Sequence, residues 1–177
     1  SNPLLSIKPY QIKSCTLLVT GNEVRKGIIE DTFSCVVEKK LAEFDVRVSA
    51  RILTGDDEAY IASCIKETVV SGEEMVLCTG GMSIDPDDRT PKAIRDSGAR
   101  IVSYGAPVLP GAMFLVSYIG DAPVLGLPGC IMYEERTIFD ILLPRFVARV
   151  PVSAYDIASL GNGGLCLQCR PCTFPNC

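Results

Sequence analysis

The stretch that decides the fold is MVLCTGGMSIDPDDRTPKAIR, residues 75–95. Its first four residues are apolar and predict a buried strand. Thr90 has the chemistry of a helix N-cap, and Pro91 suits the first helical position, so a helix is expected after the loop. A strand, a glycine-containing loop and a helix in this order predict one unit of an α/β fold.

The rest of the chain repeats this alternation. Apolar or alternating runs predict strands at 15–20, 46–53, 75–78, 100–104, 113–119 and 122–125. Helical spacing predicts helices at 31–44 with Asp31 as N-cap, 56–70, 91–97, 131–149 with an end or kink at Pro144, and 153–160. The pattern predicts an α/β three-layer sandwich, in which a mostly parallel sheet is covered by helices on both faces. We expect this domain at 14–150, a short helix and Gly-rich hinge at 151–164, and a C-terminal Cys-rich tail at 165–177.

The loop after residue 78 has the composition of an anion and metal site. Gly80 and Gly81 let the backbone approach a ligand and leave N–H groups that bind an anion. Aspartates follow at positions 85, 87 and 88, and carboxylates this close together favour a cation. A Mg²⁺ ion held between carboxylates and substrate phosphates would meet that need. The alternative is an Asp- and Pro-rich surface turn with a helix cap.

Four polar segments are expected at one edge of the predicted sheet. They are the glycine turn after the first strand, Asp31, the loop that contains Asp56, and residues 79–83. Ligands of parallel α/β sheets bind outside the carboxyl ends of the strands. We therefore expect one binding site at this edge rather than four unrelated turns.

Composition excludes several classes of function. The net charge of −4 argues against a surface that binds nucleic acid. No apolar run reaches the length of a membrane span and no signal peptide is visible, so we expect a cytoplasmic protein with no membrane partner. The absence of His removes Ser-His-Asp catalysis and every His-containing metal site. The chain begins with Ser-Asn rather than Met, which is consistent with a piece excised from behind a preceding domain.

The loop resembles the signature GG-x-[SG]…DD-x-T-P of the MoaB/Mog domain family. This family includes molybdopterin adenylyltransferases, the central domain of molybdate-inserting MoeA-type enzymes, and CinA-type domains. Four further segments resemble family motifs in the family's order: Thr20-Gly21-Asn22-Glu23-Val24, Lys26-Gly27-Ile28-Ile29-Glu30-Asp31-Thr32, Asp56-Asp57 and Leu127-Pro128-Gly129. The resemblance covers about residues 17–149.

The resemblance implies a ligand and roles for particular residues. The ligand is the phosphate of molybdopterin or an adenylylated pterin, bound with Mg²⁺ in molybdenum cofactor biosynthesis or handling. Asp31 and Asp88 match the family's essential aspartates and would serve the metal and catalysis. The expected ligand-binding residues are Thr20, Gly21, Glu23, Thr79, Gly80, Gly81, Met82, Ser83, Asp87, Thr90, Pro128, Gly129 and Cys130. The family also implies a homo-oligomer, either a dimer or a trimer.

Three departures from the family pattern leave the activity open. The adenylyltransferases carry GGTG at 80–83, where this chain has the GGMS form of MoeA-type domains. Lys92 replaces the usual acidic residue after T-P. The second proline of L-P-G-x-P is Ile131, and the residue before it is Cys130. At a helix N-terminus the pKa of a thiol can fall, so Cys130 is either a soft ligand near molybdenum or a small residue that fills a turn.

Two other functions therefore remain beside the transferase. One is a non-catalytic pterin sensor or carrier with a redox- or metal-sensitive tail, which the altered turn at Cys130 favours. The other is a CinA-like pyrophosphatase that acts on ADP-ribose or another nucleotide, because residues 86–90 also resemble the P-x-DD-x-T of those domains.

Apart from Cys130, the other eight of the nine cysteines fall into two groups of four. Four in the tail, Cys166, Cys169, Cys172 and Cys177, have the spacing of a Cys₄ site. Their C-x₂-C-x₂-C run favours a [4Fe–4S] cluster, Zn²⁺ is the close competitor, and disulfides are the third option. Cys15, Cys35, Cys64 and Cys78 lie in apolar strands or on helical patterns, and we expect them to be small buried hydrophobes.

Overall fold

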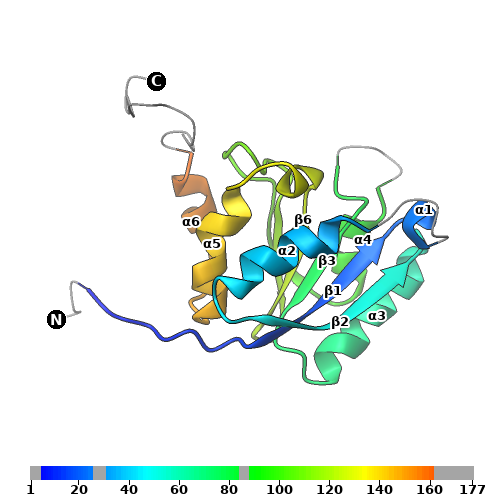
Figure 1. Ribbon diagram of the computed structural model, residues 1–177, viewed down its shortest axis with the longest axis horizontal. Helices are drawn as coiled ribbons and strands as arrows, with labels where there is room; N and C mark the ends of the chain where they lie inside the picture. Colours follow the sequence, from blue (N-terminus) through cyan, green and yellow to red (C-terminus); the bar gives the residue numbers. More distant parts are fainter. Residues whose placement is uncertain (1–4, 26–30, 84–87, 162–177) are drawn as a thin grey trace.

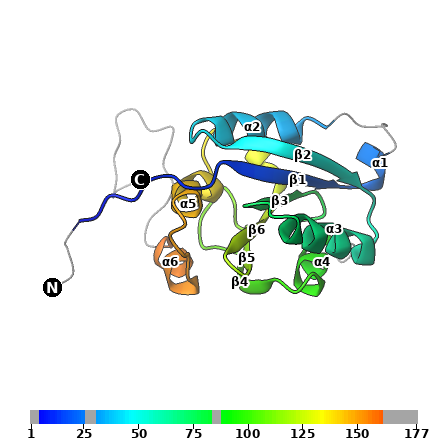
Figure 2. The same cartoon turned by 90° about the horizontal axis from the view of Figure 1, so that it is seen from below.

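The computed structural model describes residues 5–25, 31–83 and 88–161, and these form the predicted three-layer α/β sandwich. Helix α2 covers one face of the sheet, and α3 and α4 cover the other (Figures 1 and 2). Among the described residues, no helix has the length and apolarity of a membrane span.

Six strands form one mixed sheet in the order β2-β1-β3-β6-β5-β4. Their bounds are β1 Ser14–Thr20, β2 Arg47–Thr54, β3 Val76–Thr79, β4 Arg100–Tyr104, β5 Leu115–Ile119 and β6 Ala122–Leu127. The four strands β2, β1, β3 and β6 are parallel, and β5 and β4 continue the sheet in antiparallel pairs. In register, Thr20 pairs with Thr54, and Thr79 pairs with both Val19 and Leu127. The carboxyl ends of all four parallel strands therefore meet at one edge.

Helices α2 to α6 follow the predicted order, whereas α1 and η1 were not predicted. Their bounds are α1 Asn22–Arg25, α2 Phe33–Ala42, α3 Glu58–Val70, α4 Thr90–Asp96, α5 Ile138–Val147 and α6 Ala154–Ser159, with a 3₁₀ helix η1 at Gly129–Met132. Asp57 caps α3, because its carboxylate accepts the N–H of Tyr60 at 2.9 Å. Ser153 and Asp156 form a capping box on α6.

Two hydrophobic cores lie on opposite faces of the sheet because side chains alternate along each strand. Leu17 points into the core shared with α2, α5 and α6, and its neighbour Leu18 points into the core shared with α3 and α4. The central strands are buried on both faces, which explains why β1 and β3 are apolar runs rather than alternating patterns.

The helix predicted at 131–149 is wrong in its first half. The 3₁₀ turn η1 ends at Met132, and α5 begins only at Ile138. Thr137 starts α5 with a capping box: its hydroxyl accepts the N–H of Phe139, and the carboxylate of Asp140 accepts the N–H of Thr137 at 2.7 Å. Pro144 lies inside α5 rather than at its end.

Two smaller predictions also need correction. Thr90 is the first residue of α4 rather than its side-chain cap, since its hydroxyl is used in a contact with another loop. Cys35 is exposed on α2, whereas Cys15, Cys64 and Cys78 are buried as predicted. Burial raises the pKa of Cys15 and of Cys78 to about 12, so both thiols are neutral packing groups.

Candidate functional site

Buried threonine hydroxyls join the loops at the carboxyl edge of the sheet. Thr20, at the end of β1, donates to the carbonyl oxygen of Thr79 at 3.2 Å. Its hydroxyl also lies 3.0 Å from that of Thr90, which donates to the carbonyl oxygen of Gly80 at 2.8 Å. All three threonines are almost fully buried. The hydroxyls of Thr20 and Thr90 therefore hold β1, β3 and α4 together, whereas the hydroxyl of Thr79 has no partner among the described residues.

Gly80 and Gly81 are required by this arrangement. Both have positive φ, 83° and 52°, a region that side chains other than hydrogen rarely occupy. A Cβ on Gly80 would overlap the carbonyl oxygen of Thr20, and one on Gly81 would lie 2.9 Å from the hydroxyl of Thr90. The two glycines were predicted to let the backbone approach a ligand. In the structure they also let it approach the neighbouring residues Thr20 and Thr90.

Met82 turns its side chain inward. It is 4% exposed and belongs to the core under α3 and α4. A Cβ on Gly126 of β6 would collide with its methyl group, so the loop is anchored over a glycine of the neighbouring strand. The side chain of Met82 is structural, and only its backbone is left for a ligand.

Ser83, Asp88 and Tyr104 meet at the exposed end of the loop. The backbone N–H of Ser83 donates to the carboxylate of Asp88 at 2.7 Å, and the hydroxyl of Tyr104 donates to the carbonyl oxygen of Ser83 at 3.0 Å. Burial, and then the negative charge of Asp88, raise the pKa of Tyr104. An anionic oxygen thus already lies against a backbone N–H that the sequence predicted to bind an anion.

Asp31 lies before α2 and binds within its own segment. Its carboxylate accepts the backbone N–H of Ser34 at 3.0 Å and also the hydroxyl of Ser34. The N-cap position of α2 is occupied by Thr32. Asp31, one residue earlier, therefore provides an acceptor for a backbone N–H of the first turn of α2. The capping role predicted for Asp31 is present in this displaced form.

The turn after β1 is held against the end of β2. The N–H of Gly21 donates to the carbonyl oxygen of Thr54 at 3.1 Å, and the N–H of Asn22 donates to Asp56 at 3.3 Å. A Cβ on Gly55 would lie 2.5 Å from the side-chain oxygen of Asn22. These contacts bring the predicted Gly21 turn and the Asp56 loop together.

The turn from Pro128 to Cys130 follows β6 at the same edge. Pro128 is the extended residue before η1, Gly129 is exposed, and the thiol of Cys130 is half-buried. Burial raises the pKa of Cys130, which corrects the expectation of a lowered value. The reason is that η1 has only four residues, so its few aligned N–H groups do not offset desolvation.

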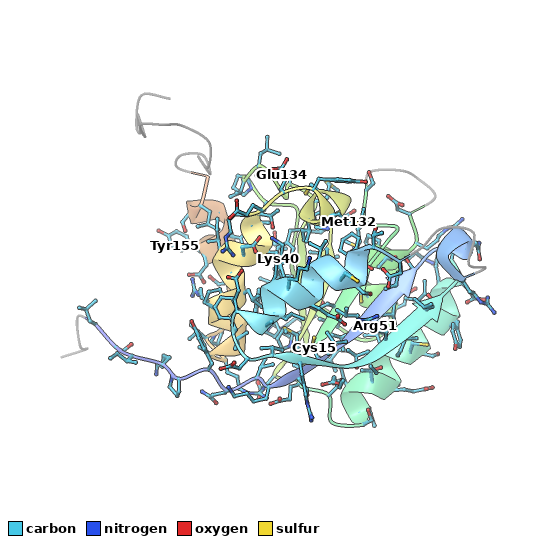
Figure 3. All side chains as sticks on the ribbon, viewed as in Figure 1. Cys15, Lys40, Arg51, Met132, Glu134 and Tyr155 are labelled. Carbon is cyan, nitrogen blue, oxygen red and sulfur yellow. The ribbon has the colours of Figure 1, made fainter. Side chains whose placement is uncertain are left out.

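A buried ion pair behind this turn fixes the segment that follows it. Lys40 of α2 and Asp140 of α5 lie 2.9 Å apart, with side chains only 7% and 5% exposed. The ammonium group of Lys40 also donates to the carbonyl oxygen of Glu135 at 2.6 Å and to that of Glu134 at 3.4 Å. Figure 3 shows Lys40 beside the segment that carries Met132 and Glu134.

The sequence analysis missed three contributors to this edge. Lys40 follows Val37 by three residues and precedes Leu41, so its position on the apolar face of α2 was the available signal. Glu58 of α3 pairs with Arg89 at 2.9 Å and with Lys92, which ties the two helix starts together. Tyr104 comes from an antiparallel strand, and no local pattern connects it to Ser83.

Only some of the residues predicted to bind a metal or ligand lie in the described part of the chain. Among the described residues, no three His, Cys, Asp or Glu side chains gather closely enough to hold a metal ion. Asp87, the side chain of Glu23, and the tail cysteines lie outside the described part of the chain. The Cys₄ site at Cys166, Cys169, Cys172 and Cys177 therefore stays a prediction.

Residues 16–148 match the model of a family described as the probable molybdopterin binding domain. The chain belongs to this molybdopterin-binding domain family. The match covers the sheet from the third residue of β1 onward and helices α1 to α5, so the five motifs and the family model agree on the same domain.

Solved structures of this domain share its fold. A molybdopterin biosynthesis protein from Mycobacterium abscessus superposes with a TM-score of 0.65 at 16% identity, covering 79% of this chain and 95% of that one. The molybdopterin biosynthesis enzyme MoaB from Thermus thermophilus gives 0.62 at 18% identity, with 80% and 99% covered. At these identities the likeness concerns the fold alone.

Curated relatives of this molybdopterin-binding domain are longer proteins. A CinA-like protein from Geobacter metallireducens is 34% identical over 87 residues, 49% of this chain and 21% of that protein. A molybdenum cofactor biosynthesis bifunctional protein from Synechococcus elongatus is 29% identical over 84 residues, 48% of this chain and 26% of that protein. The chain thus spans about a quarter or less of the length of these relatives.

Proposed function

We propose that the carboxyl edge of the sheet binds the phosphate of molybdopterin, or of an adenylylated pterin, and that the protein acts in molybdenum cofactor biosynthesis or handling. Residues 80–83 would hold the phosphate through backbone N–H groups. The Gly129 turn would form the other side of the site. The family match supports the ligand class, and the geometry of the loop supports the position.

One observation carries this proposal: the backbone N–H of Ser83 donates to the carboxylate of Asp88 at 2.7 Å. The carboxylate oxygen of Asp88 resembles a phosphate oxygen, because both are negatively charged and both accept hydrogen bonds. The loop therefore accommodates an anion without rearrangement of Gly80 or Gly81. A phosphate would take the N–H from Asp88 and leave that carboxylate next to the ligand.

The residues present also fit Mg²⁺ in one particular way. Mg²⁺ is usually held by one or two carboxylates together with substrate phosphates and water. Because no three acidic side chains converge in the described part of the chain, most of the ligands would have to come from the bound phosphate. Asp88 would supply the protein carboxylate. Asp31, which was expected to serve the metal and catalysis, already accepts two hydrogen bonds from Ser34, so we propose that it fixes α2 beside the ligand instead.

A buried hydroxyl without a partner also supports a ligand at this edge. The hydroxyl of Thr79 is buried and has no hydrogen-bond partner among the described residues. A buried hydroxyl without a partner costs about 1–3 kcal/mol in proteins. A bound phosphate or its metal-associated water would provide that partner, and this gives Thr79 a role its burial alone does not explain.

The test is binding of molybdopterin under anaerobic conditions, followed by amide chemical shifts, with Asp88→Asn as the variant. In EDTA the variant should bind several-fold more tightly, because a weaker acceptor competes for the N–H of Ser83 and a negative charge is removed. With Mg²⁺ the parent should gain more affinity than the variant. Shifts should centre on the amides of Gly80, Gly81 and Ser83.

The matched control is Asp45→Asn, which removes a charge from an exposed residue with positive φ between α2 and β2. Its affinity for molybdopterin should equal that of the parent. Weaker binding by Asp88→Asn in EDTA, or shifts that avoid the glycine loop, would refute the assignment of the phosphate to this loop.

A second candidate function is hydrolysis of a nucleotide phosphoanhydride. It is supported by several relatives named CinA-like, including one from Anaeromyxobacter that is 34% identical over 171 residues and of which the chain spans 41%. Incubation with ADP-ribose and Mg²⁺ in parallel with molybdopterin binding separates the two. Release of AMP that is lost in Asp88→Asn supports the hydrolase, whereas tight molybdopterin binding without turnover supports a carrier.

A further inference from the structure

A cavity of about 350 Å³ lies at the opposite edge of the sheet from the glycine loop. Arg100 begins β4, Asp121 lies in the turn between β5 and β6, and Pro123 is close to the start of β6. The strand β6 runs from this cavity to Leu127 at the carboxyl edge. The cavity and the proposed phosphate site are therefore separated by the length of the parallel strands.

The walls of the cavity are largely apolar and are held in place. The ring of Tyr118 lies 6.4 Å from that of Phe146 at an angle of 54°, and its hydroxyl accepts the N–H of Val152 at 3.1 Å. The chain from Val150 to Val152, which includes Pro151, closes the other side. A tyrosine fixed at both its ring and its hydroxyl forms a rigid apolar wall, which lowers the entropic cost of binding a planar ligand.

Two guanidinium groups line the cavity, and they differ in their partners. Arg149 pairs with Glu74 at 2.9 Å. Arg100 lies 5.7 Å from the centre of the Tyr118 ring, and among the described residues no acidic side chain forms an ion pair with it. Arg100 is therefore the cation available to an incoming acid.

Asp121 limits the charge of that acid. Its carboxylate also lines the cavity and forms no ion pair with Arg100 or Arg149 in the described part of the chain. One available guanidinium beside one carboxylate favours a single negative charge over a dianion or a polyphosphate, because each further charge would be repelled by Asp121. The volume is at the small end of the range of about 300–1,000 Å³ for ligand pockets.

We infer that this cavity binds a small aromatic monocarboxylate, with its ring against Tyr118 and its carboxylate on Arg100. A guanidinium presents planar paired donors that match a carboxylate. This inference concerns a second site and does not depend on the function proposed for the carboxyl edge. A ligand there would contact both the β5–β6 turn and the segment after α5.

The test uses two probes with the same ring, 1-naphthoate and the neutral 1-naphthalenemethanol, titrated into the full chain and followed by amide chemical shifts. Naphthoate should shift the amides of Gly120, Asp121 and Val152, and should bind more tightly than the alcohol. Arg100→Gln should weaken naphthoate binding about five- to tenfold, as expected for loss of a charge-assisted hydrogen bond that is partly exposed. The same variant should leave binding of the alcohol unchanged.

The matched control is Arg95→Gln, which removes a guanidinium from the exposed side of α4 outside the cavity. It should change naphthoate affinity by less than about twofold. Because Arg100 is itself exposed, its variant should fold, and an unchanged amide spectrum away from β4 checks this. Equal binding of acid and alcohol, no effect of Arg100→Gln, no saturable binding, or shifts centred on Gly81 would each overturn the inference.

Discussion

The two edges of the sheet are held together by different chemistry. At the carboxyl edge, neutral hydroxyls of Thr20 and Thr90 connect the strand ends to α4. At the amino edge, carboxylates make the connections. Glu73 accepts the hydroxyls of Ser14 at 2.6 Å and Thr16 at 2.8 Å, and it also accepts the hydroxyl of Ser49. The same strands are thus joined by uncharged groups at one end and by charged groups at the other.

The carboxylates of the two edges differ in the groups that they bind. Burial alone would raise the pKa of Glu73 and of Glu74, but hydrogen bonds from the surrounding chain outweigh it and lower both pKa values. Both carboxylates therefore accept hydrogen bonds that hold the fold together. At the carboxyl edge the carboxylate of Asp88 accepts the backbone N–H of Ser83, and in the proposed function a phosphate takes its place there. Other charged contacts near the carboxyl edge also serve structure. Asp56 accepts the N–H of Asn22, Glu58 pairs with Arg89 and Lys92, and the buried pair of Lys40 and Asp140 lies behind the Gly129 turn.

Removing Lys40 should have the largest effect on stability. Lys40→Met leaves Asp140 buried without its main partner, and breaking a buried ion pair costs about 3–5 kcal/mol. The loss should be near the lower value, because Arg136 lies 3.6 Å from Asp140. The measurement is the free energy of unfolding in urea.

The control for Lys40→Met is the double variant with Asp140→Asn, which removes both charges but keeps an acceptor for the Thr137 cap. It should recover more than half of the loss. If the double variant is as unstable as the single one, the ion pair is not the cause, and the carbonyl contacts of Lys40 are.

Removing Glu73 at the amino edge should have the second-largest effect on stability. Glu73→Ala removes the acceptor of three hydroxyls and should lower the free energy of unfolding by about 2 kcal/mol, since hydrogen bonds to charged groups contribute roughly 1.5–3 kcal/mol and water replaces part of the loss here. Glu67→Ala, on the exposed side of α3, is the matched control and should change stability by less than about 0.5 kcal/mol. Equal effects of the two variants would remove the contrast between the edges.

A pair of buried threonines sharpens the account of the carboxyl edge. Thr20→Val keeps the shape but removes the connection to Thr79 and Thr90, and should destabilise by about 1 kcal/mol. Thr79→Val removes a hydroxyl that has no partner among the described residues, and should be neutral or stabilise by about 1 kcal/mol. Thermal unfolding of both variants decides this. If Thr79→Val destabilises as much as Thr20→Val, its hydroxyl has a partner, and the support it gives to a ligand is lost.

The smallest effect concerns acid. Hydrogen bonds from the hydroxyl and then the backbone N–H of Ser153, followed by Arg145, lower the pKa of Asp156 from 3.8 to about 2. Because the pKa is lowered on folding, the ionised carboxylate stabilises the folded state at any pH above 3.8. That contribution is lost as pH falls from about 4 to about 2. Asp156→Asn should remove this part of the acid sensitivity, about 0.5 kcal/mol for a partly exposed group that solvent screens.

The acid titration also separates the contribution of Asp156 from that of the amino-edge carboxylates Glu73 and Glu74. The loss due to Glu73 and Glu74 begins as pH falls below 4.5, because both pKa values are lowered from that value. It should persist in Asp156→Asn, measured as the free energy of unfolding between these pH values. A variant with no remaining acid dependence above pH 3.8 would show that the amino-edge carboxylates contribute little.

The sequence by itself determined the class of fold and the place of the main loop. Apolar runs such as residues 75–78, helix caps such as Ser153, and glycines at positions that need positive φ are local requirements, and each is visible in the order of residues. The motifs around Gly80, Asp88 and Gly129 were also local, so the family could be inferred before the sheet was known.

Only the tertiary structure decided which groups meet. It placed Lys40 against Asp140, Tyr104 against Ser83, and Arg100 beside a turn twenty residues further along the chain. It also ended η1 at Met132, because the Thr137 cap and the carbonyl contacts of Lys40 hold the intervening segment out of a helix. Side-chain spacing records neighbours along one element, whereas these contacts depend on the order of strands in the sheet, which sets distances between residues far apart in sequence.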